Sequence, residues 1–239
     1  MNLKSKYLII ILAVIIIKIN FSINVKAEEY SRFNNISIED GLSQATVETM
    51  MQDSKGYIWL GTNDGLDRYN GYTFKKYSYE KGQENSLVNS YILDIKEDSE
   101  GNIWVATAAG ISKIYNDGEK VQNYTSDSES GNLSNDNTTT MLISNSNKIY
   151  VGTAEGINLY DKKTDKFNLI YPELKEEYIN SLAEDKYGNI WAGTENGLYK
   201  INVGTNVIEK FESTDDVNTI SENYIYKVYY DGDKHIWVG

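Results

Sequence analysis

The sequence predicts an all-β protein, a β-propeller built from four-stranded antiparallel blades. An apolar pentad centred on an aromatic residue returns five times, and the aromatic residues are spaced 45, 46, 41 and 46 residues apart, at Trp59, Trp104, Tyr150, Trp191 and Trp237. A fixed period of about 40–50 residues indicates a repeat architecture. Each repeat also alternates short apolar segments with turn residues and shows no helical periodicity, which is typical of a propeller blade.

Each repeat is expected to begin with an inner strand that ends in a tight turn. The residue six positions before the aromatic residue is an acid in four repeats and a serine in one: Asp53, Asp98, Ser144, Asp185 and Asp231. Three positions before it stand Gly56, Gly101, Asn147, Gly188 and Lys234. Glycine and asparagine tolerate positive φ, so these segments predict hairpin turns. Lys234 departs from the pattern, and Gly232 offers a shifted turn there. The recurrence of the acid predicts a structural role in the turn.

The pentad predicts the second strand, and a glycine six residues after its aromatic residue predicts the next turn, at Gly65, Gly110, Gly156 and Gly197. A third strand follows each of these glycines. A fourth strand carries Tyr77, Tyr124, Ile170 or Phe211. Within the pentad, we expect the aromatic residue to be a wedge between blades. The small residue two positions later is expected where sheets approach closely, and the next threonine is expected to bond within the turn.

Four complete blade units and part of a fifth are predicted, at residues 41–86, 87–132, 133–173, 174–219 and 220–239. The fifth unit stops inside its second strand, and residues 30–36 are expected to form an outer strand whose partner blade is not in the sequence. We therefore expect residues 28–239 to be a partial propeller domain of a longer protein.

Residues 1–27 differ in composition from the rest of the chain. Lys4 and Lys6 precede an apolar run from Leu8 to Ile17, and Val25-Lys26-Ala27 resembles a cleavage site. The run is short for a membrane span and typical of a secretory signal peptide. We expect export, with cleavage of the segment or its retention as an N-terminal membrane anchor as the two outcomes.

Composition excludes several function classes. The formal net charge is −12, which argues against nucleic acid or an anionic membrane surface as the partner, because both bind cationic patches. The chain has no cysteine and one histidine, His235, so disulfides, thiolate metal sites and multi-histidine sites lack their residues. No phosphate-binding or nucleophile motif is present. The sequence predicts no catalytic residue, no cofactor and no metal site.

The motifs as a set resemble the two-component regulator propeller family. The resemblance rests on residues 38–44, on residues 51–62 with the first pentad, and on residues 64–71, and it extends over about residues 30–239. The third repeat departs from it at Tyr150 and Ser144. The resemblance implies a seven-bladed propeller ring, truncated in this sequence, that forms the partial propeller sensor domain. It also implies that this domain is the extracytoplasmic, ligand-sensing part of a membrane-bound receptor, a homodimer whose output is a histidine kinase or a diguanylate cyclase. It also implies a small ligand, with carbohydrate as the leading class. A secreted propeller enzyme, a lyase or a glycan-active protein with its site outside these residues, and a structural adhesion module are the alternatives.

Candidate ligand-binding residues lie in or near the loops that vary in length between units, because variable loops on a rigid ring commonly carry recognition. Tyrosines offer rings on which sugars stack, and one arginine is available for an acidic ligand group. The candidates are Tyr79, Tyr91, Tyr171, Tyr178, Tyr224 and Arg68. For Arg68 the alternative is a structural pairing with a nearby acid.

Overall fold

The computed structural model describes residues 33–127 and 132–239. Residues 36–239 form one compact unit, and the account below concerns that unit. The predicted signal segment, residues 1–27, lies outside the described residues. So do residues 30–32 of the expected outer strand, and residues 33–36 of it lie in no strand. No helix formed by the described residues is both long and apolar enough to cross a membrane.

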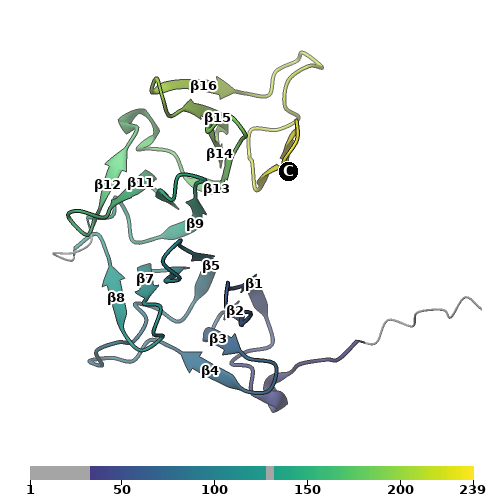
Figure 1. Cartoon of the computed structure of the whole chain (residues 1–239). Coiled ribbons are helices and arrows are strands. Elements are labelled where there is room, and N and C mark those ends of the chain that lie inside the picture. Colours follow the sequence, from purple (N-terminus) through teal and green to yellow (C-terminus); the bar gives the residue numbers. More distant parts are fainter. Residues whose placement is uncertain (1–32, 128–131) are drawn as a thin grey trace, which may run out of the picture. The chain divides into compact units, whose positions relative to one another are not determined.

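The fold is all-β and consists of four complete antiparallel sheets and one partial sheet, which confirms the predicted blades (Figure 1). The first sheet contains β1 (Val47–Gln52), β2 (Ile58–Thr62), β3 (Gly65–Tyr69) and β4 (Phe74–Tyr77). The second contains β5 (Ile92–Glu97), β6 (Ile103–Thr107), β7 (Gly110–Ile114) and β8 (Val121–Tyr124). The third contains β9 (Thr138–Ile143), β10 (Ile149–Thr153), β11 (Gly156–Asp161) and β12 (Lys166–Ile170). The fourth contains β13 (Ile179–Glu184), β14 (Ile190–Thr194), β15 (Gly197–Asn202) and β16 (Val207–Phe211), and the partial sheet contains β17 (Val228–Tyr230) and β18 (Ile236–Val238).

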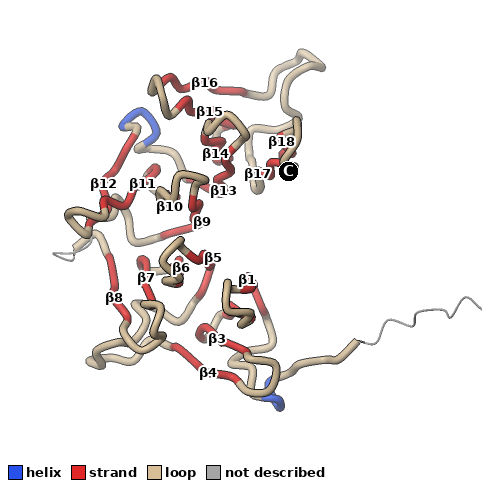
Figure 2. Tube along the Cα trace, viewed as in Figure 1, coloured by secondary structure: helices blue, strands red, loops and turns tan. Residues whose placement is uncertain are grey.

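Two short 3-10 turns, η1 (Ile38–Asp40) and η2 (Pro172–Leu174), are the helical elements among the described residues (Figure 2). Within each complete sheet the strands pair in chain order, and the first strands β1, β5, β9, β13 and β17 contact one another in succession. The sheets are therefore joined through their first strands, as blades of a propeller are.

In the four complete sheets the aromatic residues of the pentads lie between sheets, as predicted, whereas Trp237 of the partial sheet is 62% exposed. Trp59 and Trp104 are 2% and 0% exposed, and each belongs to an apolar cluster that includes residues of the following sheet. Trp191 is half-buried, packed against a smaller cluster with Ile225 and Val228 of the partial sheet. The hydrophobic core is thus divided into clusters at the junctions between sheets, so each sheet is stabilised by its neighbours.

The recurrent acid is structural, as predicted. In the first sheet the Asp53 carboxylate accepts hydrogen bonds from the Trp59 indole at 2.8 Å and from the backbone N–H groups of Lys55 and Tyr57 at 3.0 and 2.8 Å. The carboxylate therefore holds the turn and the wedge in one geometry. The turns have the expected backbone, with φ of 89° at Gly56 and 58° at Asn147. In the fifth repeat the shifted turn is used, with φ of 82° at Gly232.

The pentad threonine shapes the next turn in every complete sheet. Its hydroxyl donates to the carbonyl of the glycine three residues later, at 2.8 Å for Thr62, 2.8 Å for Thr107, 3.2 Å for Thr153 and 2.9 Å for Thr194. These turns bond to the segment before the next sheet, for example from the Gly65 N–H to the Ser90 carbonyl at 2.7 Å. The turns between second and third strands and the loops between sheets therefore gather on one face.

Candidate functional site

A polar hollow of about 460 Å³ lies over the first strands of the sheets, on the face where those turns and loops gather. It is lined by Glu48, Thr49, Tyr91, Leu93, Asp94, Ala108, Asn137, Thr139, Thr140, Tyr178, Asn180, Tyr226 and Lys227. These residues come from β1, β5, β9 and β13, from the segments that precede β5, β9, β13 and β17, and, for Ala108, from the β6–β7 turn. The site is therefore built by several repeats together, and no single blade contains it.

A β-bulge at the start of each inner strand points one side chain into the hollow. The pairing of β1 with β2 passes from Val47 to Thr49 across an irregularity, which leaves Glu48 without a pairing partner. The same irregularity occurs in the next three sheets. The residues skipped are Glu48, Leu93, Thr139 and Asn180. All four line the hollow. A bulge adds one residue to one strand and redirects its side chain, which is why bulges recur next to binding sites.

Hydrogen bonds between neighbouring sheets fix the walls of the hollow. Asp94 receives the Met141 N–H of the next sheet at 2.9 Å and pairs with Lys96 at 2.6 Å. The Asn180 side chain donates to the Ile225 carbonyl at 3.0 Å. The Thr139 hydroxyl donates to the carbonyls of Gly152 and Ile179. The polar groups that surround the hollow are therefore positioned before any ligand arrives, which lowers the cost of binding.

Two of the six predicted site residues line this hollow. Tyr91 and Tyr178 lie at its rim, and the Tyr178 hydroxyl accepts a long hydrogen bond, 3.5 Å, from the Asn137 side chain. Tyr226, which the sequence analysis did not select, completes a set of three tyrosines. Ligand contact by these residues stays a prediction.

The other four predicted residues lie elsewhere. Tyr79 is 51% exposed and lines none of the hollows described here. Tyr224 lines a separate hollow of about 210 Å³ beside the partial sheet. Tyr171 lines a hollow between the third and fourth sheets. Their distances along the chain from an inner strand explain the separation, because only the residues immediately before an inner strand reach the hollow over it.

Arg68 packs on aromatic rings. Its guanidinium carbon lies 4.6 Å from the Tyr57 ring centroid and 5.7 Å from that of Trp59. Within the described part of the chain it forms no ion pair, and its pairing with a nearby acid stays a prediction. The cation instead covers the wedge of the first sheet, where the faces of aromatic rings attract positive charge.

No cluster of three or more histidine, cysteine, aspartate or glutamate side chains that suits a metal ion occurs in residues 33–127 and 132–239. His235 is exposed and bonded through Nδ1 to the Asp231 carboxylate at 2.8 Å, in the turn before β18. The arrangement over the inner strands is suited to non-covalent recognition, with three aromatic rings, hydroxyls, amides, carboxylates and one lysine.

A comparison of the repeats shows a signal that would have located the hollow. The residue eleven positions before each pentad aromatic residue is Glu48, Leu93, Thr139, Asn180 or Tyr226. All five line the hollow. The residue before each of them is the β-branched Val47, Ile92, Thr138, Ile179 or Ile225. The position eleven residues before the aromatic residue thus carries a different type of side chain in every repeat, whereas the position before it is always β-branched. This contrast indicates that the variable position faces the surface and is functional.

Comparisons with known proteins agree with this architecture. The sequence model described as "Two component regulator propeller" matches residues 41–64, 86–109 and 173–196. A 57-residue segment, 23% of the chain, is 42% identical to Histidine kinase P4 of Formosa agariphila and spans 4% of that protein. Three segments of the chain are therefore similar to the two component regulator propeller repeat, and the predicted family resemblance is confirmed.

Solved structures share the fold at low sequence identity. One is described as the extracellular domain of a hybrid two component system from B. thetaiotaomicron, with a TM-score of 0.57, 19% identity, and coverage of 86% of this chain and 40% of that one. Another is virginiamycin B lyase from Staphylococcus aureus, with a TM-score of 0.60, 15% identity, and coverage of 83% and 64%. The chain thus spans less than two thirds of the length of each of these proteins, and the likeness to the structures concerns the fold.

Proposed function

We propose that this chain is the extracytoplasmic ligand-sensing propeller of a membrane-bound signalling receptor of the two-component type, with a histidine kinase as its output. The three matched repeats and the segment similar to Histidine kinase P4 support the receptor class. The fold shared with a structure described as an extracellular domain supports the location. A diguanylate cyclase output is the variant of this proposal in which the same sensor controls a different enzyme.

The ligand proposed for the polar hollow is a short neutral or basic oligosaccharide. Tyr91, Tyr178 and Tyr226 offer rings on which the apolar faces of sugars stack, while the amides and hydroxyls of Asn137, Asn180 and others match sugar hydroxyls. Glu48 and Asp94 also line the hollow, which disfavours an anionic ligand. The observation that carries the proposal is the bulged residue that each inner strand directs into one shared hollow.

The binding test is a thermal-shift screen of the full chain against defined oligosaccharides, followed by calorimetry on each hit. A ligand at about 100 times its dissociation constant adds about 2.7 kcal/mol to the free energy of unfolding, which is a readily measured shift. The variant Tyr178→Ala is expected to weaken binding at least about fivefold, because truncating an aromatic ring that anchors a ligand costs more than about 1 kcal/mol. Tyr79→Ala, exposed and outside the hollow, is the matched control. Equal affinity in both variants would place the ligand elsewhere.

Signal transmission requires the ligand to prefer one arrangement of the receptor over another. We propose that the ligand shifts the geometry of a receptor homodimer. Small-angle scattering of the receptor with and without the oligosaccharide is the measurement, and a change in the dimer's distance distribution is expected. Identical curves at saturation would contradict this step without affecting the binding site.

The proposed location has its own test. Fusing residues 1–60 to an alkaline phosphatase that is active only after export is expected to give an active enzyme, because the apolar run Leu8–Ile17 is a secretory signal in this proposal. Changing Ile15 and Ile16 to arginine is the control and is expected to abolish activity. An inactive fusion that is synthesised at normal levels would contradict export.

A further inference from the structure

Three of the four complete sheets carry the same four-part cluster next to the following sheet. A tryptophan indole donates to an aspartate, stacks on a ring of the fourth strand, and lies under a cation from the third strand. The clusters are Trp59–Asp53–Tyr77–Arg68, Trp104–Asp98–Tyr124–Lys113 and Trp191–Asp185–Phe211–Lys200. The indole nitrogen lies 2.8, 2.8 and 3.0 Å from the carboxylate, and the stacked ring centroids are 5.5, 5.7 and 5.7 Å apart.

The third sheet has lost all four members. Tyr150 replaces the tryptophan, and Ser144 stands in the place of the aspartate. Tyr150 pairs with Leu159 in the register in which Trp104 pairs with Lys113, so the cation is replaced by leucine. Ile170 pairs with Ile157 as Tyr124 pairs with Ile111, so isoleucine replaces the stacked ring.

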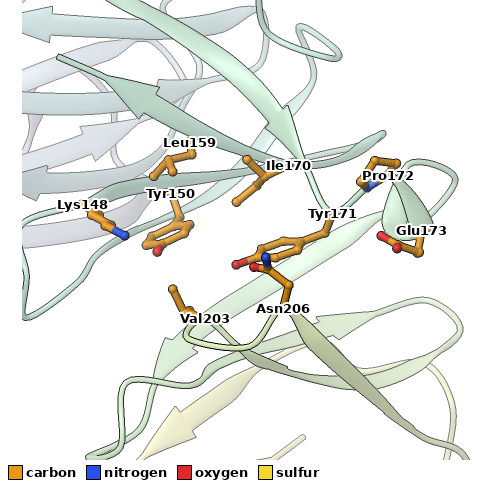
Figure 3. A pocket seen from close by; sticks show the side chains of 9 residues that line it. All are labelled: Lys148, Tyr150, Leu159, Ile170, Tyr171, Pro172, Glu173, Val203 and Asn206. Carbon is orange, nitrogen blue, oxygen red and sulfur yellow. The ribbon is translucent and has the colours of Figure 1, made fainter. Parts of the chain in front are cut away.

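A hollow of about 460 Å³ lies where the cluster is missing (Figure 3). Tyr150, Leu159 and Ile170 form its wall on the third sheet, and Val203 and Asn206, from the β15–β16 turn, form the wall on the fourth. Tyr171, Pro172, Glu173 and Lys148 complete the lining. The hollow at the junction of the second and third sheets, where the cluster is present, measures about 180 Å³. The loss of the cluster is therefore accompanied by a larger open volume.

Tyr150 places a hydroxyl without a protein partner in this hollow. The residue is 2% exposed, and its ring projects into the space between Leu159 and Val203 (Figure 3). Its hydroxyl forms no hydrogen bond with any described residue, whereas the corresponding indoles all bond to an aspartate. Among the described residues no fully enclosed side-chain nitrogen or oxygen lacks a partner, so this hydroxyl opens onto the hollow. Burial, together with the nearby Tyr171 and Glu184, raises the pKa of Tyr150 to about 12, so the hydroxyl stays protonated and can donate to a bound acceptor.

One hydrogen bond between sheets is absent among the described residues of this junction. Tyr77 donates to the Gly118 carbonyl of the next sheet at 3.1 Å, and Tyr124 donates to the Asp165 carboxylate at 2.8 Å. Ile170 has no group that can make the equivalent bond. Beside it, Tyr171 has φ of 55°, a strained conformation for a bulky residue, and its hydroxyl end points toward Tyr150 (Figure 3).

We propose that the hollow between the third and fourth sheets binds a small planar aromatic molecule that carries a hydrogen-bond acceptor, in the place of the indole that the sister blades supply themselves. The class follows from the lining. Aliphatic side chains and two tyrosine rings favour a flat apolar body, and the few polar groups, with the Tyr150 hydroxyl at the floor, favour one polar substituent. Apolar cavities of this kind bind free aromatic molecules when a protein's own ring is missing.

The test uses 5-fluoroindole-3-carboxamide and the full chain, with fluorine NMR as the readout. A dissociation constant on the order of 0.1 to 1 mM is expected for a ligand of this size. The variant Ser144→Asp with Tyr150→Trp restores the indole and its acceptor and is expected to weaken binding at least about tenfold, because the protein's own ring fills the space. Val203→Phe fills the hollow from the opposite wall and is also expected to weaken binding of the probe at least about tenfold. This variant is used in place of the double variant if the double variant does not fold.

Two further variants separate this site from the polar hollow over the inner strands. Tyr150→Phe removes only the hydroxyl and is expected to weaken binding about 3- to 10-fold. Tyr178→Ala is expected to leave binding of the aromatic probe unchanged, although it is expected to weaken oligosaccharide binding. No detectable binding to the unmodified chain, or equal binding by the chain and by both filled variants, would overturn the proposal and leave the oligosaccharide site untouched.

Discussion

The small residue in each pentad sets how closely two sheets approach. A Cβ atom added to Gly152 would lie 2.7 Å from the Ile179 Cγ2 and 2.8 Å from the Thr140 Cγ2. The first and fourth sheets repeat this, with Gly61 against Ile92 and Gly193 against Ile225. Such distances are well inside van der Waals contact, so alanine at these positions requires the neighbouring sheet to move.

The second sheet shows how the chain accommodates a larger residue. It carries Ala106 in place of glycine, and the residue equivalent to Ile179 there is Thr138. Both are 0% exposed, and the Thr138 hydroxyl donates to the Thr107 carbonyl of the second sheet at 2.6 Å. The hydrogen-bonded hydroxyl of Thr138 thus faces the second sheet, whereas a methyl group of isoleucine faces each of the first, third and fourth sheets. Glycine is therefore matched with isoleucine and alanine with threonine.

The matching predicts a specific coupling. Gly152→Ala alone is expected to lower the free energy of unfolding by about 1–3 kcal/mol through overpacking. Ile179→Thr alone is expected to cost about 1–3 kcal/mol, because it removes buried methylene and adds a hydroxyl. In the double variant the threonine hydroxyl can donate to the Thr153 carbonyl, as Thr138 does to Thr107, and the clash is relieved. We expect the double variant to be more stable than the sum predicts by about 1–2 kcal/mol.

The assay is urea denaturation followed by far-ultraviolet circular dichroism for the chain, both single variants and the double variant. Gly204→Ala is the control, because the nearest atom to its added Cβ lies 3.5 Å away, and it is expected to change stability by less than about 0.5 kcal/mol. Additivity of the two substitutions within about 0.5 kcal/mol would refute the reasoning, since independent sites behave in that way.

Two other predictions concern the wedges and their turns. Trp104→Ala is expected to lower the free energy of unfolding by about 3–5 kcal/mol, because the Trp104 side chain is 0% exposed. Trp237→Ala is expected to cost less than about 1 kcal/mol in the same denaturation assay, because Trp237 is 62% exposed. Equal losses of stability in the two variants would contradict the wedge role. Burial opposes ionisation of Asp165, but hydrogen bonds from Tyr160, Tyr124 and a glutamine hold the pKa of that carboxyl below its usual value. A lowered folded-state pKa gives stability that is present above the unfolded-state pKa of about 3.9 and is lost as the pH falls through the folded-state pKa. Asp165→Asn is therefore expected to have a lower free energy of unfolding than the unmodified chain at pH 7, and this difference is expected to narrow below about pH 4. A difference in stability that does not change with pH would contradict this.

The repeat pattern was sufficient to predict the fold because the same residues satisfy the same physical requirements in each blade. Asp53 and Gly56 fix a turn, Trp59 fills a junction and Gly61 permits close approach, and each role was assigned from its recurrence at a fixed offset. These contacts are mostly within one repeat or between adjacent repeats. They can therefore be predicted from the fixed spacing of residues in the sequence. The departure of Lys234 was likewise resolved correctly by Gly232, because a turn needs a residue with positive φ.

The site was predicted less well because it depends on side-chain direction. Tyr79, Tyr171 and Tyr224 are close in sequence to variable loops, but only residues immediately before an inner strand, such as Tyr91 and Tyr178, face the hollow. Glu48 and its equivalents reach it through a bulge, and a bulge reverses the alternation on which inward and outward faces are assigned. Simple strand periodicity therefore assigns these residues to the wrong face.

The two hollows depart from the repeat in different ways, and the difference has a physical origin. Over the inner strands a single position varies in every blade, because a bulged side chain faces the hollow, where side chains of different size and polarity can be accommodated. At the third junction a whole cluster is replaced in one blade. Its members depend on each other: an indole left without its aspartate buries an unpaired N–H, at a cost of about 1–3 kcal/mol, so the tryptophan and the acid are lost together. That coupling explains Tyr150 and Ser144. It does not explain why Leu159, Ile170 and Val203 leave the volume open, since larger apolar side chains at any of these positions would refill it and add stability. An apolar volume beside a hydroxyl that has no partner among the described residues is the space that the proposed planar aromatic ligand would fill.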